Sequence, residues 1–355
     1  MSRFFSSKYS TLEAYTPGEQ PKDMKYIKLN TNESPFPPSP AVIEAAKFEA
    51  GRLNLYSDPE STDLTRAVAE LFSVEYSEVL MTNGSDEILN FAFMAFCDEK
   101  KGIAFPDITY GFYPVFAALG GIPCKEIPLK EDFSINPDDY IGIPENVVIA
   151  NPNAPTGMTL SLADIERIVA SDLSRVVIID EAYVDFGGES AVPLTKKYDN
   201  LLITGTFSKS RSLAGARLGY GIGNKALIDD LKTIKYSTNP YNVNRMTGAA
   251  GLAAVRDNAY YMQNAKTVMK NREYTERELV RLGFEVLPST ANFVFAGSPE
   301  IGGEELYLKL KGAGILVRHF KKKRIENFNR ITIGTLEEMQ AFISAVEKIL
   351  EEKRQ

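Results

Sequence analysis

Residues able to do chemistry recur directly after the short apolar segments of this sequence. Lys209 follows the segment 201–204, and Asp180 follows the segment 176–179. Burial at the end of a strand can lower the pKa of a lysine and make it a nucleophile towards aldehydes. A carboxylate in such a place is costly unless it is paired. Asp180 therefore needs a cationic partner, which is either a structural arginine or a protonated ring nitrogen.

A second group of residues is suited to binding an anion. Ser85 and Asp86 open an amphipathic helical pattern, and the first N–H groups of a helix favour negative charge. An ordinary helix N-cap is the alternative reading of that motif. Thr206, Ser208 and Arg217 follow a later apolar segment and could together bind a phosphate.

The elements that must position these residues form a repeating pattern. Continuous apolar segments of strand length occur at residues 79–82, 102–105, 147–150, 176–179 and 201–204. Helical patterns, such as 86–96 and 161–170, lie between several of them. This alternation predicts an α/β fold with a mostly parallel sheet. Ligands bind at the carboxyl ends of such strands, where the residues above lie.

The chain divides into three parts. Residues 1–32 carry little periodicity and predict an extended arm, which we expect near the small domain and the active site. Residues 33–243 form the predicted large α/β domain, and residues 244–355 a smaller α+β domain. In that last part a charged helical stretch runs to residue 282. It is followed by strand-like segments at 284–287, 293–295, 315–317 and 331–333, and by a closing helix that Thr335 and Glu338 cap.

The composition excludes several classes of function. The 40 Lys and Arg against 47 Asp and Glu give a net charge of -7, which offers no footprint for nucleic acid or anionic membrane. Two cysteines, Cys97 and Cys124, and one histidine, His319, are too few for a disulfide framework or a zinc site, so we expect no metal. No apolar run approaches the roughly 20 residues of a membrane span. We expect a cytoplasmic protein.

A series of motifs, in order along the chain, carries a family resemblance. They are LNTNE at 29–33, NGSDE at 83–87, PNAPTG at 152–157, DEAY at 180–183, SK at 208–209, GAR at 215–217, PYNVN at 240–244, NF at 292–293 and RITIG at 330–334. The set resembles the histidinol-phosphate aminotransferases, which are fold-type I pyridoxal-phosphate enzymes. The resemblance implies pyridoxal 5'-phosphate as the cofactor and small molecules as substrates.

The resemblance also implies roles for individual residues. Lys209 would carry the cofactor as a Schiff base and move a proton between the substrate and the cofactor. Asp180 would pair with the ring nitrogen, Tyr183 would donate to the phenolic oxygen, and Tyr110 would stack on the ring. The cofactor phosphate would be held by Ser85, Asp86, Thr206, Ser208 and Arg217. Tyr56 would reach the neighbouring subunit's cofactor, which implies a homodimer.

The substrate residues implied in the same way are Tyr15, Asn32, Arg318 and Arg330. Arg330 matches an arginine that binds a substrate carboxylate, while Tyr15 and Arg318 match groups that bind a substrate phosphate. A solvated basic loop at 318–324 is the alternative for that segment. His319 has no role in this scheme.

One position departs from the family pattern. The family has an asparagine directly before Pro-Thr-Gly, whose amide donates to the phenolic oxygen of the cofactor, but this chain has Ala154 there. Asn153 is the nearest asparagine and is a candidate cofactor ligand. Adjacent side chains in an extended segment point in opposite directions, so Tyr183 is favoured as the remaining donor.

The activity that follows is transamination of L-histidinol phosphate with 2-oxoglutarate, a step of histidine biosynthesis. An aromatic amino-acid aminotransferase and a threonine-phosphate decarboxylase are the alternatives within the fold. A cofactor-binding regulatory module without turnover is the alternative outside enzymes. The intact Lys209, Asp180 and Arg217 argue against it.

Overall fold

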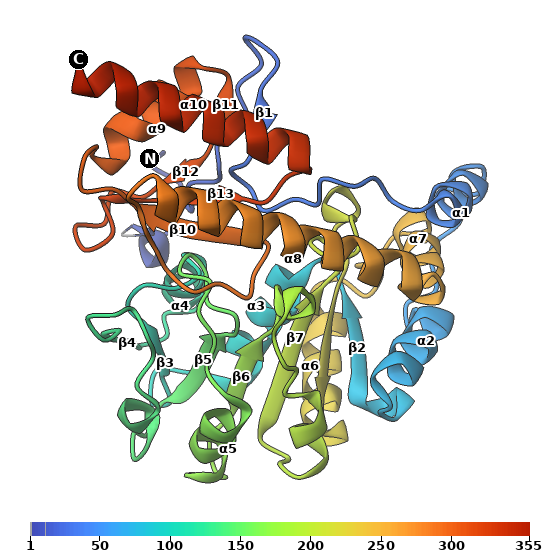
Figure 1. Ribbon diagram of the computed structural model, residues 1–355. Coiled ribbons are helices and arrows are strands. Elements are labelled where there is room, and N and C mark those ends of the chain that lie inside the picture. Colours follow the sequence, from blue (N-terminus) through green and yellow to red (C-terminus); the bar gives the residue numbers. More distant parts are fainter. Residues whose placement is uncertain (1, 11) are drawn as a thin grey trace.

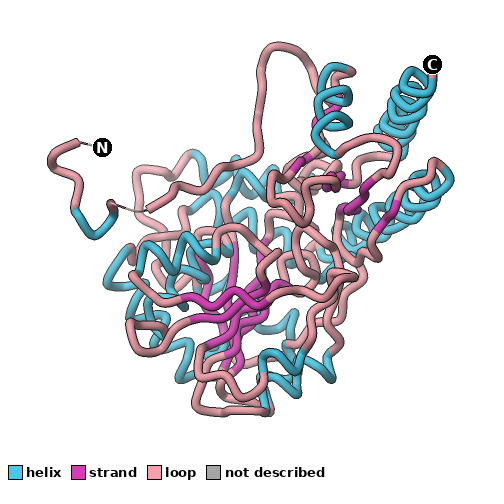
Figure 2. The backbone as a smooth tube through the Cα atoms, turned by 90° about the vertical axis from the view of Figure 1, so that its left-hand side faces the viewer, coloured by secondary structure: helices cyan, strands magenta, loops and turns pink. Residues whose placement is uncertain are grey.

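The computed structural model describes residues 2–10 and 12–355. A seven-stranded sheet forms the centre of the larger body (Figures 1 and 2). Its order is β2 (Val79–Thr82), β8 (Gly219–Gly223), β7 (Leu201–Thr206), β6 (Val177–Asp180), β5 (Asn146–Ala150), β3 (Ile103–Pro106) and β4 (Cys124–Ile127). Only β8 runs antiparallel to its neighbours within this sheet. The predicted mostly parallel α/β fold is confirmed.

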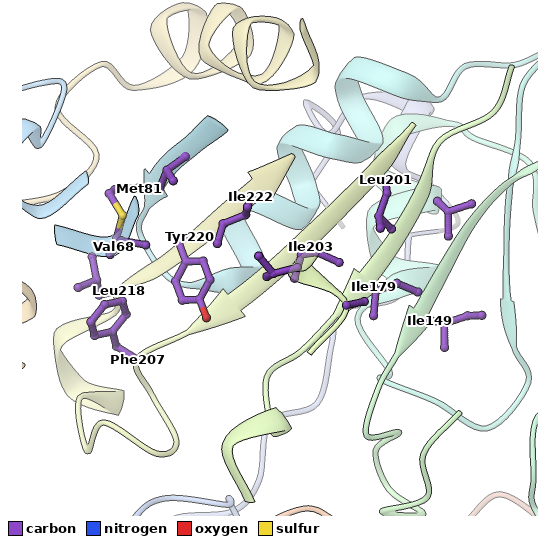
Figure 3. Close-up of a cluster of buried hydrophobic side chains, with 14 of the residues drawn as sticks. Val68, Met81, Ile149, Ile179, Leu201, Ile203, Phe207, Leu218, Tyr220 and Ile222 are labelled. Atoms are coloured by element: carbon purple, nitrogen blue, oxygen red, sulfur yellow. The ribbon is translucent and has the colours of Figure 1, made fainter. Parts of the chain in front are cut away.

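Helices cover both faces of this sheet because its strands are apolar on both sides. Val177 and Ile179 pack on one face and Ile178 on the other. The first face is covered by α2 (Thr62–Phe72), α5 (Leu162–Ala170) and α7 (Arg245–Arg256). The second is covered by α3 (Ser85–Phe96), α4 (Tyr113–Gly120) and α6 (Lys225–Thr238). Figure 3 shows the first face, where Ile149, Ile179 and Ile203 come from adjacent strands.

A second, smaller sheet is built from the C-terminal part of the chain. Its order is β12 (Arg318–His319), β13 (Phe328–Thr332), β10 (Phe293–Gly297) and β9 (Glu285–Val286). Helices α8 (Asn258–Arg281), α9 (Gly303–Gly312) and α10 (Leu336–Arg354) pack around it, and α8 runs between the two bodies (Figure 1). The predicted capping box of Thr335 and Glu338 begins α10.

Three details differ from the sequence-based expectations. The segment 315–317 contains β11 (Ile315–Leu316), which pairs in parallel with β1 (Ile27–Lys28) of the N-terminal arm rather than with the small sheet. The charged stretch to residue 282 is two helices, not one. The first of them, α7, packs on α1 (Pro40–Ala50) and on the large sheet. The chain therefore leaves the large body along α8, later than the expected boundary at residue 244.

Within the described part of the chain, no helix is both long enough and apolar enough to cross a membrane.

Candidate active site

Two adjoining cavities lie at the carboxyl ends of the large sheet's strands. The inner one, of about 90 Å³, is lined by Ser85, Asp86, Tyr110, Ala150, Ala154, Asp180, Ala182, Tyr183, Thr206, Ser208, Lys209 and Arg217. The outer one, of about 390 Å³, extends towards the small sheet and the N-terminal arm. Tyr110, Ala154, Tyr183 and Lys209 line both cavities. Most of the predicted cofactor residues therefore meet in one place.

One end of the inner cavity is built to receive an anion. Helix α3 begins at Ser85, and its N-cap residue Gly84 has no side chain to occupy the first N–H groups. The Arg217 guanidinium lies against this helix start, with Nη1 3.4 Å from the Ser208 hydroxyl and Nη2 3.0 Å from the Asp86 carboxylate. The Thr206 hydroxyl is 3.0 Å from that of Ser208.

Glycine permits this arrangement. A Cβ on Gly84 would lie 2.6 Å from Nη2 of Arg217, and a Cβ on Gly219 would lie 2.5 Å from the backbone nitrogen of Ser85. Hydroxyls, a guanidinium and helix N-terminal amides are the donors that bind phosphate in proteins. The residues present therefore fit the phosphate group of pyridoxal phosphate.

The inner cavity also carries a buried carboxylate. Asp180 ends β6 and is only 4% exposed. It accepts hydrogen bonds from the hydroxyls of Tyr113 (2.9 Å) and Thr204 (3.3 Å). Burial raises its pKa to about 6, while the bond from Tyr113 acts in the opposite direction. No guanidinium or ammonium group pairs with Asp180 among the described residues. A cationic ring nitrogen suits this place.

Lys209 lines both the inner and the outer cavity. It follows β7, and its Nζ donates to the carbonyl oxygen of Thr31 (3.3 Å) from the N-terminal arm. The same Nζ lies 5.6 Å from the ring centroid of Tyr183. Tyr110 faces it from the other side of the cavity, where its hydroxyl donates to Asp86 (2.7 Å). The lysine can therefore reach a group bound in either cavity.

The structure does not bring Asn153 to the inner cavity. Its amide nitrogen donates to the carbonyl oxygen of Ile108 and to the hydroxyl of Thr156, both at 3.0 Å. Its Oδ1 accepts from the hydroxyl of Thr109 (2.7 Å). The structure thus places the expected cofactor ligand Asn153 outside the inner cavity, with both ends of its amide engaged elsewhere. Ala154, which does line the cavity, has no polar group.

The outer cavity gathers the four predicted substrate residues, Tyr15, Asn32, Arg318 and Arg330. Arg330 donates to the carbonyl oxygen of Asn30 (3.0 Å), and its Nε is buried with no partner in the described chain. Arg318 donates to the carbonyl oxygens of Thr16 and Pro17, both at 3.3 Å. Burial raises the pKa of the Tyr15 hydroxyl, an effect that the charges of Arg318 and Arg330 oppose.

Tyr56, which was predicted, and His319, which had no predicted role, lie outside the inner cavity. Tyr56 is 80% exposed, outside both cavities, and its ring stacks on that of Tyr241. His319 lies in β12 and contacts the carbonyl oxygen of Glu326 (2.8 Å). Three residues with contacts in this region were not predicted from the sequence: Tyr113 and Thr204, which donate to Asp180, and Thr332, which donates to Asn32. Tyr113 opens α4 three residues after Tyr110, and no local pattern pointed to its partner Asp180.

Comparison with known proteins agrees with this geometry. Residues 24–346 match the family model for aminotransferase class I and II. A histidinol-phosphate aminotransferase from Brachyspira hyodysenteriae is 51% identical over 352 residues, which cover 99% of each chain.

Solved structures share the fold. A putative histidinol-phosphate aminotransferase from Erwinia carotovora atroseptica is 26% identical, with a TM-score of 0.85 over 92% of this chain and 96% of that one. A histidinol-phosphate aminotransferase from Sinorhizobium meliloti, solved in complex with pyridoxal-5'-phosphate, has a TM-score of 0.85 at 23% identity, covering 92% of each chain. The chain described here belongs to the class I and II aminotransferases and, within them, to the histidinol-phosphate aminotransferase family.

Proposed function

We propose that this chain is a cytoplasmic, pyridoxal-phosphate-dependent aminotransferase that transfers the amino group of L-histidinol phosphate to 2-oxoglutarate. The observation that carries the proposal is the continuity of the two cavities. An inner cavity that suits a phosphorylated pyridine opens at Lys209 into an outer cavity that carries two arginines and a phenol. The family to which the chain belongs supplies the substrate class.

The inner cavity would hold the cofactor at both ends. Arg217, Ser208, Thr206 and the first N–H groups of α3 would bind its phosphate, and Asp180 would bind its ring nitrogen. When bound, pyridoxal phosphate withdraws electrons from the substrate and makes the proton on the substrate Cα acidic. Tyr113 and Thr204 keep the Asp180 carboxylate oriented by donating to it.

Lys209 would hold the cofactor covalently and, once displaced by a substrate amine, move the Cα proton. Its Nζ lies where the cavities join, within reach of groups bound in both. Tyr110 and Tyr183 flank the same place and would limit the access of water to the proton being moved. The same lysine serves both halves of the reaction, since each begins with the loss of a proton next to the reacting nitrogen.

The outer cavity would bind the anionic end of the substrate. Two guanidinium groups and a phenol suit a phosphate dianion better than a single carboxylate. Arg318 and Arg330 now donate to backbone carbonyl oxygens of the N-terminal arm. A charged phosphate accepts stronger hydrogen bonds than a neutral carbonyl, so it would compete well for these donors.

The active form would be a homodimer. Apolar residues gather, highly exposed, on the segment from α1 to Tyr56: Ile43 (40%), Phe48 (69%), Leu53 (57%), Leu55 (53%) and Tyr56 (80%). A second copy covering this face would bring Tyr56 to the partner's cofactor phosphate. Mixing the inactive variants Tyr56→Ala and Lys209→Ala tests this. Random pairing should restore about a quarter of wild-type activity, because half of the dimers carry one complete site. No restoration would place Tyr56 outside the partner's site.

One experiment tests the activity itself. The cofactor-loaded protein is mixed separately with histidinol phosphate, glutamate, phenylalanine and threonine phosphate, while the absorption band of the lysine-bound cofactor and the release of carbon dioxide are recorded. We expect histidinol phosphate and glutamate to remove the band without carbon dioxide. A preference for phenylalanine would indicate an aromatic aminotransferase, carbon dioxide from threonine phosphate a decarboxylase, and no change with any compound a binding module.

A further inference from the structure

Because position 154 carries alanine, Tyr183 is the residue that we expect to donate to the phenolic oxygen of the cofactor. Tyr183 is 8% exposed and lines both cavities. A hydroxyl has only one hydrogen, so it can donate to the cofactor only if its other neighbours do not accept that hydrogen. The contacts of Tyr183 therefore decide whether its hydroxyl can donate to the cofactor.

Asn32 makes the decisive contact. Its Nδ2 lies 3.0 Å from the Tyr183 hydroxyl, and both residues are buried. An amide nitrogen carries hydrogens and no acceptor, so Tyr183 accepts at this contact. Its own hydrogen is then free to point into the cavity.

The orientation of the Asn32 amide is fixed by Thr332 of β13. The Thr332 hydroxyl accepts from the backbone N–H of Asn32 (3.0 Å) and donates to its Oδ1 (2.9 Å). Thr332 is only 2% exposed, and Asn32 Oδ1 is the one acceptor that its hydrogen finds among the described residues. Turning the amide over would leave that buried hydrogen unpaired, and it would make Tyr183 donate to Asn32 instead of to the cavity.

We propose that Asn32 is a positioning residue which, held by Thr332, directs the hydrogen of Tyr183 towards the phenolic oxygen of the cofactor. This rests on the proposed function, and it reassigns Asn32, which the resemblance placed among the substrate ligands. The three residues compensate for the amide that Ala154 lacks. They come from β13, from the end of the N-terminal arm and from the loop after β6, so this arrangement exists only where these three parts meet.

The readout is the pH at which the absorption of the lysine-bound cofactor changes. A donor to the phenolate favours the charged form, so losing the donor raises the pKa of this transition. The charged and titratable groups that face Tyr183 from the surrounding elements are Lys209, Arg330, Tyr15, Tyr110, Tyr113 and Asp180, and the variants below leave all of them in place.

The variants are Thr332→Val, which removes the hydroxyl at nearly constant shape, and Thr332→Ser, which keeps it. Thr332→Val should raise the pKa of the transition by about 0.5 to 1 unit, a fraction of the effect of one hydrogen bond to a charged acceptor. Thr332→Ser should leave it within about 0.2 units. In a Tyr183→Phe background Thr332→Val should add nothing, because Asn32 then has no hydroxyl to direct.

The outcomes separate the two proposals. An equal shift from Thr332→Val in both backgrounds, or no shift in either, overturns the role of Asn32 while leaving the aminotransferase assignment intact. A shift in the wild-type background alone supports it. Absence of the cofactor band in the wild-type protein would overturn both proposals. Asn32→Ala serves as a second variant if Thr332→Val does not fold, with the same dependence on Tyr183 expected.

Discussion

Two parts of the cofactor site, one for the phosphate and one for the phenolic oxygen, are assembled in different ways. At the phosphate end three of the partners are near one another in sequence: Thr206 and Ser208 are two residues apart, and Ser208 and Arg217 nine. Only Asp86, at the start of α3, is distant, 131 residues from Arg217. At the phenolic-oxygen end the partners are far apart in sequence, since Asn32 and Tyr183 are 151 positions apart and Asn32 and Thr332 are 300 positions apart. The first end depends on one loop and one helix start, and the second depends on how three parts of the chain pack.

This difference has a physical consequence. Binding of the cofactor phosphate should survive changes elsewhere in the molecule, because the local backbone sets its geometry. The environment of the phenolic oxygen should respond to changes in β13 and at the end of the N-terminal arm. The predictions below test whether the two ends are separable in this way.

The largest effect is expected for Lys209→Ala. Turnover should fall by at least about 10³-fold, because Lys209 is the only amine among the described residues that lines both cavities. The phosphate end is untouched, so the variant should still bind pyridoxal phosphate noncovalently, as equilibrium dialysis would measure. Lys225→Ala, a change on the exposed face of α6, is the matched control. If Lys209→Ala bound no cofactor, the contacts to the phosphate alone would not be enough to hold it.

Arg318→Ala should discriminate between substrates. It should weaken histidinol phosphate by about 2 to 4 kcal/mol, the scale for truncating one partner of a buried charge pair, and glutamate by less. Half-reaction titrations with each substrate measure both values. Arg324→Ala, in the same basic segment but bonded to the carbonyl oxygen of Lys130, is the control. Equal losses on the two substrates would remove Arg318 from phosphate recognition and favour the aromatic aminotransferase.

Asp180→Asn should stabilise the apoprotein at neutral pH. Burial raises the pKa of Asp180 to about 6, so between roughly pH 4 and 6 the folded chain binds more protons than the unfolded chain. The free energy of unfolding therefore falls as the pH rises through that window. At pH 7 the variant should be more stable than wild type by up to about 3 kcal/mol, and this gain should shrink towards pH 4.

Urea unfolding of both apoproteins at several pH values measures this difference. Glu181, whose pKa burial raises to about 7, remains in both proteins and does not contribute to it. The variant should at the same time bind the cofactor more weakly. A gain that is independent of pH would contradict the assignment of the effect to this carboxylate.

Much of this architecture could be predicted from the sequence because it depends on short local patterns of residues. The five apolar segments became β2, β3, β5, β6 and β7 within about two residues at each end, since buried parallel strands need continuous apolar side chains. The residues that follow these strands were expected at one edge of the sheet, and Lys209, Asp180 and Arg217 indeed line one cavity.

Other features of the fold and of the site depend on long-range contacts, which no short sequence pattern predicts. Strand β8 has glycine at three of its five positions, and a Cβ on Gly219 would collide with the start of α3. Its composition reflects close approach of backbones and not strand propensity. The contacts in the active site could not be predicted for the same reason. Only the tertiary structure shows that Asn153 bonds to Ile108 and that Asn32 reaches Tyr183.

The smallest effects are expected at the phenolic-oxygen end. Tyr183→Phe should raise the pKa of the cofactor's absorption change by about 1 to 2 units, because a hydrogen bond to a charged acceptor is lost. Ala154→Asn should lower it by adding a donor, and Asn153→Ala should change it little because that amide is engaged elsewhere. Spectrophotometric pH titration of the three variants compares them. A large shift in Asn153→Ala with none in Tyr183→Phe would show that Tyr183 is not the donor.

The most direct test of the site is to find which lysine carries the cofactor. Borohydride reduction of the cofactor-loaded wild-type protein fixes that link, and peptide mapping by mass spectrometry then locates it. We expect a label on Lys209 alone, at the junction of the two cavities. A label on any other lysine would contradict it.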